Sequence, residues 1–356
     1  MIYRVKFYLL SLVSLFAFSA EAQDIHFSQI HATPLALNPA MTGVFEGSGR
    51  LIGNYRNQWK SVTADYKTFM FSADMNIAGP SKNSILGIGG QLYNDVAGDL
   101  DFTTNGAFLS LSVMQAFNDE GDHILSGGLQ IGQVSNRFDP TKIIAYQDEY
   151  ALLEDGVNQL SYLDFTAGVL WYMRFGGGEF LYLGGSMMHT NNPIVSFYNI
   201  DPTSEQQNEL YRRYVIHGGA NLNIGPNYTL VPSMILMAQG PNREATLGTF
   251  VRYENLDKKS SNPAALMFGA WFRAFQFSQG TVNADATIVA IHVDYSNLTF
   301  TFSYDINTSS LTHISAGRGG PEISVMYTFG TQSLDKSTLE GDKPRTSRSK
   351  VKCPIW

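Results

Sequence analysis

The sequence predicts an all-β fold, namely a transmembrane antiparallel up-and-down β-barrel of about 14 strands. Three observations predict this class. Apolar and polar residues alternate with a period of two over most of the stretch from Gly47 to Phe329, as the two faces of a strand require. Most alternating runs have about 10 to 15 residues, which is enough to cross a bilayer when tilted. The connections between the runs alternate between short turns and longer segments, as in outer-membrane barrels.

The composition agrees with a membrane barrel and excludes several other classes. Charged residues make up only 15% of the 356 residues, where an average soluble domain carries about 25%. The aromatic content of 13% excludes a disordered chain, and the net charge of -7 argues against a nucleic-acid partner. Two folds fit these values: an unusually apolar soluble β protein, or a barrel whose apolar face meets lipid. After residue 22, no apolar run reaches the length of about 18 residues that a spanning helix needs.

Residues 1–22 are predicted to be a secretory signal peptide. Arg4 and Lys6 precede an apolar stretch from Phe7 to Phe18, and Ala20-Glu21-Ala22 has the pattern of a cleavage site. A transmembrane anchor is the alternative, but the apolar stretch has about 12 residues where a spanning helix needs about 20. The predicted mature chain therefore begins at Gln23 and is exported.

Residues 23–47 are predicted to form a separate N-terminal segment. They show little alternation and contain Pro34, Pro39 and Gly43, which do not suit a transmembrane strand. Two interpretations remain open for this segment. It braces or plugs the lumen of the barrel, or it is a periplasmic lead-in with no further role.

Residues 48–329 are predicted to form the barrel itself. The even number of strands is the one that single-chain outer-membrane barrels use. The predicted strands cover about 48–58, 66–78, 84–94, 102–117, 122–136, 161–175, 180–189, 213–223, 228–239, 244–254, 265–275, 284–295, 298–305 and 321–329.

The two faces of the predicted strands differ in chemistry. In the run 67–77, Phe69 and Phe71 share one face, while Ser72 and Asp74 share the other. A packed sandwich core would not tolerate unpaired charges, whereas a lumen would. The charged residues expected on the inner face are Arg50, Asp74, Asp164, Arg174, Arg252, Glu254, Arg273, Asp294 and Glu322. Their mixed signs favour salt bridges within the wall over a selectivity path for a solute, which would need a ladder of one sign.

The lengths of the connections predict the orientation of the barrel. If the first strand starts at the periplasm, connections after even-numbered strands should be short and those after odd-numbered strands long. The long connections Arg137–Leu160, Thr190–Arg212 and Ile306–Gly320 follow this rule, and the short Gly240–Arg243 turn is an exception. The first of these is acidic, which indicates solubility or, alternatively, a calcium ion or a surface partner.

Residues 330–356 are predicted to form a polar, basic periplasmic tail. Between residues 343 and 352 the tail carries five basic residues and no acidic one. Such a run is usually a solvated tail. It is also suited to docking an acidic periplasmic partner, in which case the single cysteine, Cys353, is a thiol able to pair with another chain.

The sequence contains no pattern that predicts catalysis, a cofactor or a metal ion. The seven histidines lack the spacing of metal ligands on a helix, and the Gly-rich spots lack the Lys-Ser/Thr of a phosphate-binding loop. No G-x-S-x-G occurs, and no Ser, His and carboxylate gather at the predicted strand ends. The sequence therefore predicts a protein that is not an enzyme.

Several short motifs together resemble the PorP/SprF family of type IX secretion system membrane proteins of Bacteroidota. Each motif is weak alone, but their order and spacing over the mature chain are specific. They are Phe27-Ser-Gln29, the stretch Pro34 to Gly43 with Asn38, Pro39 and Ala40, the stretch Arg56 to Trp59, Pro232-Ser-Met, the stretch Gly269 to Arg273 with Trp271, the stretch Phe302 to Asp305 with Tyr304, Glu322-Ile-Ser, and the ending Lys352-Cys353-Pro354-Ile-Trp356.

The resemblance implies an outer-membrane barrel with a periplasmic tail and no catalytic residues. It implies a role in secretion or gliding, in which the barrel binds, helps export or anchors a large adhesin-like surface protein through its C-terminal domain, alongside other type IX components. Asn38-Pro39-Ala40 and Gly43 are expected to set a turn beside the lumen, because Pro fixes φ and Gly permits positive φ. Lys350, Lys352, Cys353, Pro354 and Trp356 are expected partner contacts. The alternative function is a channel for a small solute, suggested by the polar inner face.

Overall fold

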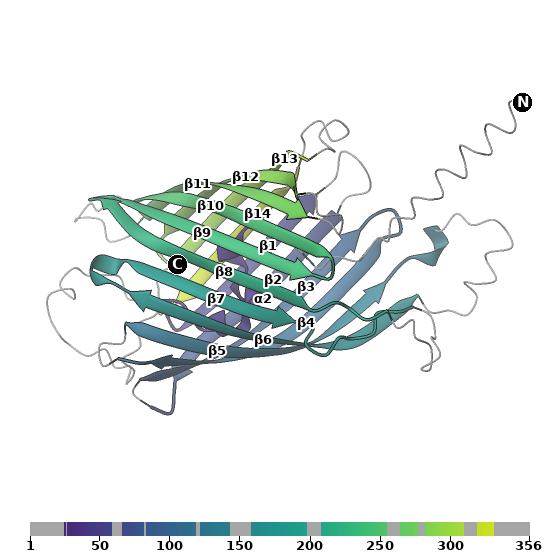
Figure 1. Ribbon diagram of the computed structural model, residues 1–356, viewed down its shortest axis with the longest axis horizontal. Helices are drawn as coiled ribbons and strands as arrows, with labels where there is room; N and C mark the ends of the chain where they lie inside the picture. Colours follow the sequence, from purple (N-terminus) through teal and green to yellow (C-terminus); the bar gives the residue numbers. More distant parts are fainter. Residues whose placement is uncertain are drawn as a thin grey trace, which may run out of the picture.

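The computed structural model is a closed, antiparallel β-barrel in which every strand pairs with its sequence neighbours (Figure 1). It describes residues 25, 27–58, 66–81, 83–118, 122–142, 158–197, 208–254, 264–276, 282–309 and 319–330. The strands are β1 (Gly49–Gln58), β2 (Tyr66–Ala78), β3 (Ser84–Ala97), β4 (Phe102–Ala116), β5 (His123–Arg137), β6 (Gln159–Arg174), β7 (Phe180–Met188), β8 (Arg213–Gly225), β9 (Tyr228–Gln239), β10 (Asn242–Glu254), β11 (Ala264–Gln276), β12 (Val282–Tyr295), β13 (Leu298–Asn307) and β14 (Pro321–Phe329).

The predicted fold class and the fourteen predicted strands are confirmed. The largest differences lie at strand ends, as in β3, which continues to Ala97 past the predicted end near residue 94. Polar side chains hold this extension, since Asn94 donates to Asn105 at 2.8 Å and Asp95 accepts from Thr68 at 2.5 Å. Because consecutive polar residues do not alternate with apolar ones, the alternation stops before the strand does, and the predicted end falls short of the observed one.

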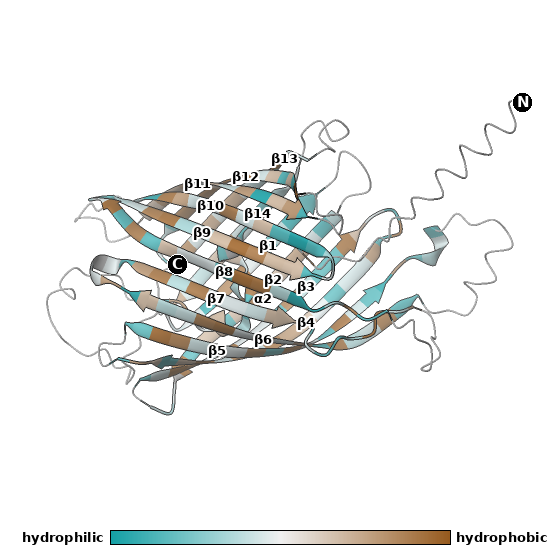
Figure 2. Cartoon of the chain, in the orientation of Figure 1, coloured by the Kyte–Doolittle hydropathy of each residue, from teal (hydrophilic) through white to brown (hydrophobic). Residues whose placement is uncertain are grey.

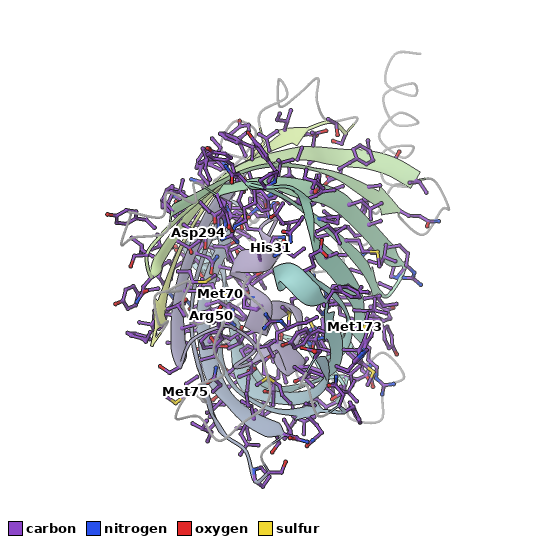
Figure 3. All side chains as sticks on the ribbon, turned by 90° about the vertical axis from the view of Figure 1, so that its left-hand side faces the viewer. His31, Arg50, Met70, Met75, Met173 and Asp294 are labelled. Carbon is purple, nitrogen blue, oxygen red and sulfur yellow. The ribbon has the colours of Figure 1, made fainter. Side chains whose placement is uncertain are left out.

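The two faces of the wall differ as the alternation predicts. In β2, Met70 is 2% exposed and points inward, whereas Met75 is 50% exposed and points outward (Figure 3). Nearly all the large apolar side chains that the structure exposes in the strands belong to the outward set. Hydrophobic residues therefore recur along the strands in Figure 2, with hydrophilic and intermediate residues between them. Insertion into a bilayer would remove this apolar face from water. Because the barrel is closed, no strand edge is left with unpaired backbone N–H and C=O groups in the lipid.

The two ends of the barrel have different connections. The connections 138–158, 189–212 and 308–320 share one end, which we call the long-loop end. The opposite end carries the turns after β2, β4, β6, β8, β10 and β12, and we call it the short-turn end. β1 pairs with β14 to close the ring, with Gly49 opposite Phe329 at the short-turn end and Arg56 opposite Glu322 toward the long-loop end.

Residues 28–45 lie inside the barrel, against its inner wall (Figure 1). They form three short helical turns, η1 (Ile30–Ala32), α2 (Pro34–Leu37) and η2 (Pro39–Met41). Ser28 contacts Glu322 near the long-loop end, and Ser48 donates its N–H to Phe329 at the short-turn end. The segment thus crosses the lumen from the long-loop end to the short-turn end before β1 begins.

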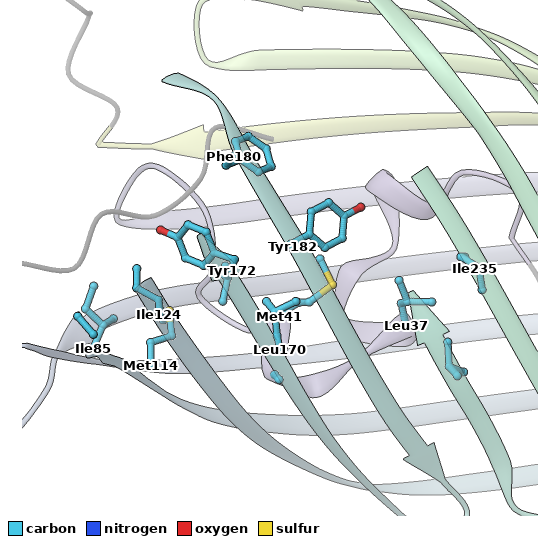
Figure 4. Packing of buried hydrophobic residues seen from close by; sticks show 14 residues of the cluster. Leu37, Met41, Ile85, Met114, Ile124, Leu170, Tyr172, Phe180, Tyr182 and Ile235 are labelled. Carbon is cyan, nitrogen blue, oxygen red and sulfur yellow. The ribbon is translucent and has the colours of Figure 1, made fainter. Parts of the chain in front are cut away.

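An apolar cluster joins this segment to the strands (Figure 4). Leu37 and Met41 of the segment pack among wall residues that include Leu170, Tyr172 and Tyr182. Burying a side chain of this size contributes about 1.5–3 kcal/mol, so the segment and the apolar residues of the wall form a core that holds the two together. Among the described residues, no helix is long and apolar enough to cross a membrane.

Candidate functional site

The candidate site is the surface between the N-terminal segment and the inner wall. Four glycines make room there for residues 38–42. A Cβ on Gly87 of β3 would lie 2.1 Å from the Thr42 carbonyl oxygen, and one on Gly128 of β5 would lie 2.3 Å from the Ala40 nitrogen. A Cβ on Gly168 of β6 would lie 2.0 Å from Asn38 Oδ1. The fourth is Gly184 of β7, where a Cβ would lie 2.4 Å from His217 Nε2 and 3.0 Å from Asn38 Nδ2. The first three positions require glycine because the segment occupies the side-chain space, and at Gly184 the imidazole of His217 occupies that space as well.

Serine hydroxyls of the wall donate hydrogen bonds to the carbonyl groups of the segment. Ser186 of β7 donates to the Leu37 oxygen at 2.7 Å, and Ser126 of β5 donates to the Ala40 oxygen at 2.7 Å. Ser112 of β4 donates to the Thr42 oxygen at 2.6 Å. A buried carbonyl without a partner costs about 1–3 kcal/mol. The wall thus satisfies the backbone of a segment that has little regular structure of its own.

Asn38 is a fully enclosed polar side chain of the segment, with an exposed fraction of 0%. Its Nδ2 donates to the Val169 oxygen of β6 at 2.9 Å and to the Gly185 oxygen of β7 at 3.3 Å. It also lies 2.9 Å from Nε2 of the buried His217. Its Oδ1 accepts the Ala40 N–H at 2.9 Å, which caps η2. Asn38 therefore joins two strands to the turn that follows it.

Gly43 ends this motif with a φ of +72°, a conformation that L side chains rarely adopt. Its N–H donates to Asp74 Oδ2 at 2.8 Å. Asp74 in turn receives a bidentate pair from Arg50, with Nε–Oδ1 at 2.9 Å and Nη2–Oδ2 at 2.8 Å. The Arg50 guanidinium also lies 4.5 Å from the centre of the Phe45 ring. One buried ion pair thus holds the end of the segment at two points.

A second buried ion-pair network lies near the long-loop end and spans the closure between β1 and β14. Asp305 Oδ2 accepts from Arg56 Nη2 at 2.8 Å and from Arg273 Nη2 at 3.0 Å. Arg56 Nη1 also lies 3.8 Å from Glu322 Oε2. Arg273 pairs with Asp285, which is the extra residue of a β-bulge in β12. A bulge re-aims a side chain, and here it places the Asp285 carboxylate on Arg273.

Ser28 and Gln29 attach the start of the segment to this charged network. The backbone N–H groups of Ser28 and Gln29 donate to the two Glu322 carboxylate oxygens at 2.8 and 3.0 Å. The Ser28 hydroxyl donates to Asp305 at 2.7 Å and accepts from Arg273 Nη1 at 3.0 Å. The segment is therefore anchored to buried charges at both ends of the lumen.

His31 lies beside an aromatic pair formed by Phe250 and Trp271, of which Trp271 belongs to the sequence motifs. Trp271 packs edge-on against Phe250 at 4.6 Å and donates its indole N–H to Ser233 at 2.9 Å. His31 lies within 6.5 Å of both rings, next to a cavity of about 30 Å³, which is room for a water molecule. Burial, followed by the charge of His292, lowers the pKa of His31 to about 4. The imidazole is therefore neutral at pH 7.

The structure places the predicted motif residues in different parts of the barrel. Asn38, Pro39, Ala40 and Gly43 meet the glycine-rich wall, whereas Arg273 and Asp305 lie in the charged network. Tyr304 stands apart, because it falls on the outward phase of β13, where its hydroxyl accepts the Gly319 N–H at 3.4 Å. Outside the described residues lie Trp59, Lys350, Lys352, Cys353, Pro354 and Trp356.

Several interior residues were not predicted from the sequence. Arg56 belongs to a sequence motif that does not predict its role, namely a 1% exposed side chain that pairs with Asp305. The sequence motifs do not single out the wall glycines and serines either. The pattern that could predict them is that Ser126 and Gly128 fall on the inward phase of one strand and Gly168 falls on that of the next. Small residues at matching inward positions of neighbouring strands predict a segment packed against them.

The chemistry of this interior is that of a binding surface. Buried charged groups here form ion pairs with one another or hydrogen bonds to the segment. Such charge-assisted hydrogen bonds are stronger than hydrogen bonds between neutral groups. In the part of the chain that the structure describes, no group of three or more His, Cys, Asp or Glu side chains is arranged to hold a metal ion. The arrangement recognises polypeptide backbone through hydroxyls, carboxylates and close-fitting glycines.

The chain is similar in overall form to solved membrane barrels. A TodX monoaromatic hydrocarbon channel mutant (deltaS2S3) superposes with a TM-score of 0.48 at 8% identity, over 83% of this chain and 94% of that one. The CymD monoaromatic hydrocarbon channel has a TM-score of 0.45 at 11% identity, over 84% of this chain and 93% of that one. The beta domain of the Bordetella autotransporter BrkA has a TM-score of 0.39 at 12% identity, over 80% of this chain and 100% of that one. At these values the likeness carries no argument about function.

The comparison with protein families is more specific than the structural likenesses. No curated protein matches the sequence. The family described as type IX secretion system membrane protein PorP/SprF matches residues 19–327. That range includes the N-terminal segment inside the lumen and nearly all of the barrel. The chain therefore belongs to the PorP/SprF family of type IX secretion system membrane proteins, as its motifs predict.

Proposed function

We propose that this barrel is a non-enzymatic component of the type IX secretion or gliding machinery that holds a large secreted surface protein at the outer membrane. In this role it binds, helps export or anchors an adhesin-like protein through that protein's C-terminal domain. The observation that carries the proposal is the family match over residues 19–327. The packed N-terminal segment supports it further, because a lumen that contains its own polypeptide suits binding better than the flow of solute.

The two ends of the barrel suggest where partners bind. The strands that the connections 138–158, 189–212 and 308–320 join meet them at the long-loop end, which we assign to the cell surface. The tail, with its five basic residues between 343 and 352, follows β14 at the opposite end. We assign contacts with other type IX components to this tail, with Lys350, Lys352, Cys353, Pro354 and Trp356 as its contact residues.

Two tail variants test the proposal in cells. Deleting residues 343–356 should leave barrel assembly unchanged, since the described barrel ends before the tail begins. It should reduce both surface display of the client protein and the recovery of partners in a pull-down after mild detergent extraction. A matched variant keeps the length of the tail but replaces its five basic residues by Gln. Equal loss in both variants assigns the contact to charge, whereas normal display and normal pull-down in both would refute the role of the tail.

The second candidate function is an outer-membrane channel for a small solute. The observation in its favour is the polar inner face, which includes Thr166, Thr246 and Thr301. A channel would let small sugars or ions into proteoliposomes at a rate that depends on their size. We expect no such uptake from the full chain, and a size-dependent uptake would favour the channel instead.

A further inference from the structure

We propose that the inner wall of β2–β7 is a peptide-binding groove, and that residues 35–43 occupy it as a ligand able to exchange with a second peptide of the same sequence. The proposal assigns a binding site inside the barrel and a ligand class, a short peptide with an Asn-Pro-Ala core. It concerns the lumen alone and does not depend on the identity of any secreted client.

The wall recognises the backbone of its occupant through side chains. Hydroxyls of Ser186, Ser126 and Ser112 donate to the carbonyl groups of residues 37, 40 and 42 at 2.6–2.7 Å. Gln130 adds a longer bond to the carbonyl of Leu35 at 3.3 Å, and Asp74 accepts the N–H of Gly43. These donors and acceptors lie on several strands. They therefore describe a site for a chain rather than a single contact.

The segment is held without the pairing that binds strands to one another. No β ladder includes any of the described residues between 27 and 48. The covalent link to the barrel runs through Gly47 and Ser48 into β1. The other attachments of residues 35–43 to the wall are hydrogen bonds that involve a side chain and the apolar contacts of Leu37, Ala40 and Met41. A peptide cut free of that link would still meet every one of these contacts.

The groove selects for particular residues in its occupant. Pro39 has no N–H, so η2 begins without an unsatisfied donor. Ala40 is 0% exposed and lies against Gly128, where a larger residue would collide with the wall. Asn38 supplies the amide that reaches β6 and β7. A ligand of this groove therefore needs Asn, Pro and a small residue in succession, with glycine three positions later at Gly43.

The test uses the full chain with a protease recognition sequence inserted between Glu46 and Gly47. After assembly in detergent, cleavage converts the segment into a free ligand, and a fluorescent peptide of residues 27–47 is added in excess. We expect the labelled peptide to bind the barrel at a ratio of about one to one. The same peptide with Asn38→Ala should bind about 10- to 100-fold more weakly, since it loses several buried hydrogen bonds.

A matched pair of wall variants gives the control. Gly168→Ala places a Cβ 2.0 Å from Asn38 Oδ1, whereas Gly127→Ala places one where nothing lies within 4 Å. Overpacking of this kind should weaken peptide binding by about 10- to 100-fold for Gly168→Ala and leave Gly127→Ala unchanged. Equal binding by both variants, or no binding by a cleaved barrel that remains folded by gel mobility, would overturn the proposal.

A second measurement covers the case in which cleavage unfolds the barrel. The uncut full chain with Asn38→Ala carries a weakened occupant, so it should take up the labelled wild-type peptide. The uncut wild-type chain, whose groove is filled, should take up much less. If neither chain binds the peptide, or if both bind it equally, the groove does not recognise residues 35–43 as a ligand.

Discussion

Replacing Asp305 by Asn should measure how strongly the charged network supports the barrel. Asp305 Oδ2 accepts hydrogen bonds from Arg56 at 2.8 Å, Arg273 at 3.0 Å and Ser28 at 2.7 Å. The substitution keeps the shape of the side chain and removes its charge. A hydrogen bond to a charged group contributes about 1.5–3 kcal/mol and a neutral one about 0.5–1.5 kcal/mol. With two guanidinium donors affected, the free energy of unfolding should fall by about 2–3 kcal/mol.

The assay is urea unfolding of the protein refolded in lipid vesicles, followed by circular dichroism. The midpoint should fall while the slope of free energy against urea stays unchanged, because the surface exposed on unfolding is the same. The matched control is Asp101→Asn, which removes a carboxylate paired with Lys142 at an exposed site. Exposed pairs contribute about 0–1 kcal/mol, so the control should stay within that range.

The comparison of the two variants decides the outcome. If Asp305→Asn unfolds at the same urea concentration as Asp101→Asn, the buried network does not stabilise the barrel as its geometry implies. Hydrogen exchange adds a local reading. The Ser28 and Gln29 amides donate to Glu322 beside Asp305, so their protection should fall in the Asp305 variant alone.

Two further substitutions test the segment itself. Gly43→Ala should lower the free energy of unfolding by about 2 kcal/mol, because φ is +72° and the new Cβ would lie 2.9 Å from Gly87 Cα. The control is Gly53→Ala, whose Cβ would have nothing within 4 Å and which should change that free energy by less than about 0.5 kcal/mol. Equal effects of the two variants would contradict the role of Gly43. Burial lowers the pKa of His31 to about 4 from an ordinary 6.5, so the unfolded chain binds the proton first as the pH falls. His31 alone should therefore lower the free energy of unfolding by about 2 kcal/mol from pH 7 to pH 5, and a His31→Phe variant that keeps the full drop of the wild-type protein would refute the assignment.

The barrel could be predicted from the sequence because the bilayer and the lumen impose opposite chemistry on alternate residues. In β2, Phe69 and Phe71 meet lipid while Ser72 and Asp74 face the lumen, so a single strand already identifies its two faces. The connection lengths then distinguish the two ends. The family could be predicted as well, because its motifs depend on residue identity and order rather than on three-dimensional contacts.

The interior could be predicted only in outline, because its contacts join residues far apart in the chain. Arg56 meets Asp305 across 249 positions, and this pairing exists only once β1 has closed onto β14. The groove poses a different difficulty. Gly168 is a weak strand former when its sequence is read alone, and its role becomes visible only when Asn38 occupies the space of its absent side chain.

The conductance of the full chain in planar lipid bilayers tests the central claim most directly. The claim is that the N-terminal segment fills the lumen of a barrel that serves protein binding. Residues 28–45 lie in the lumen, and buried ion pairs join the strands around them. The barrel should therefore carry no steady current at moderate voltage. A large, constant open-state current from the correctly assembled protein would contradict the account and favour a channel.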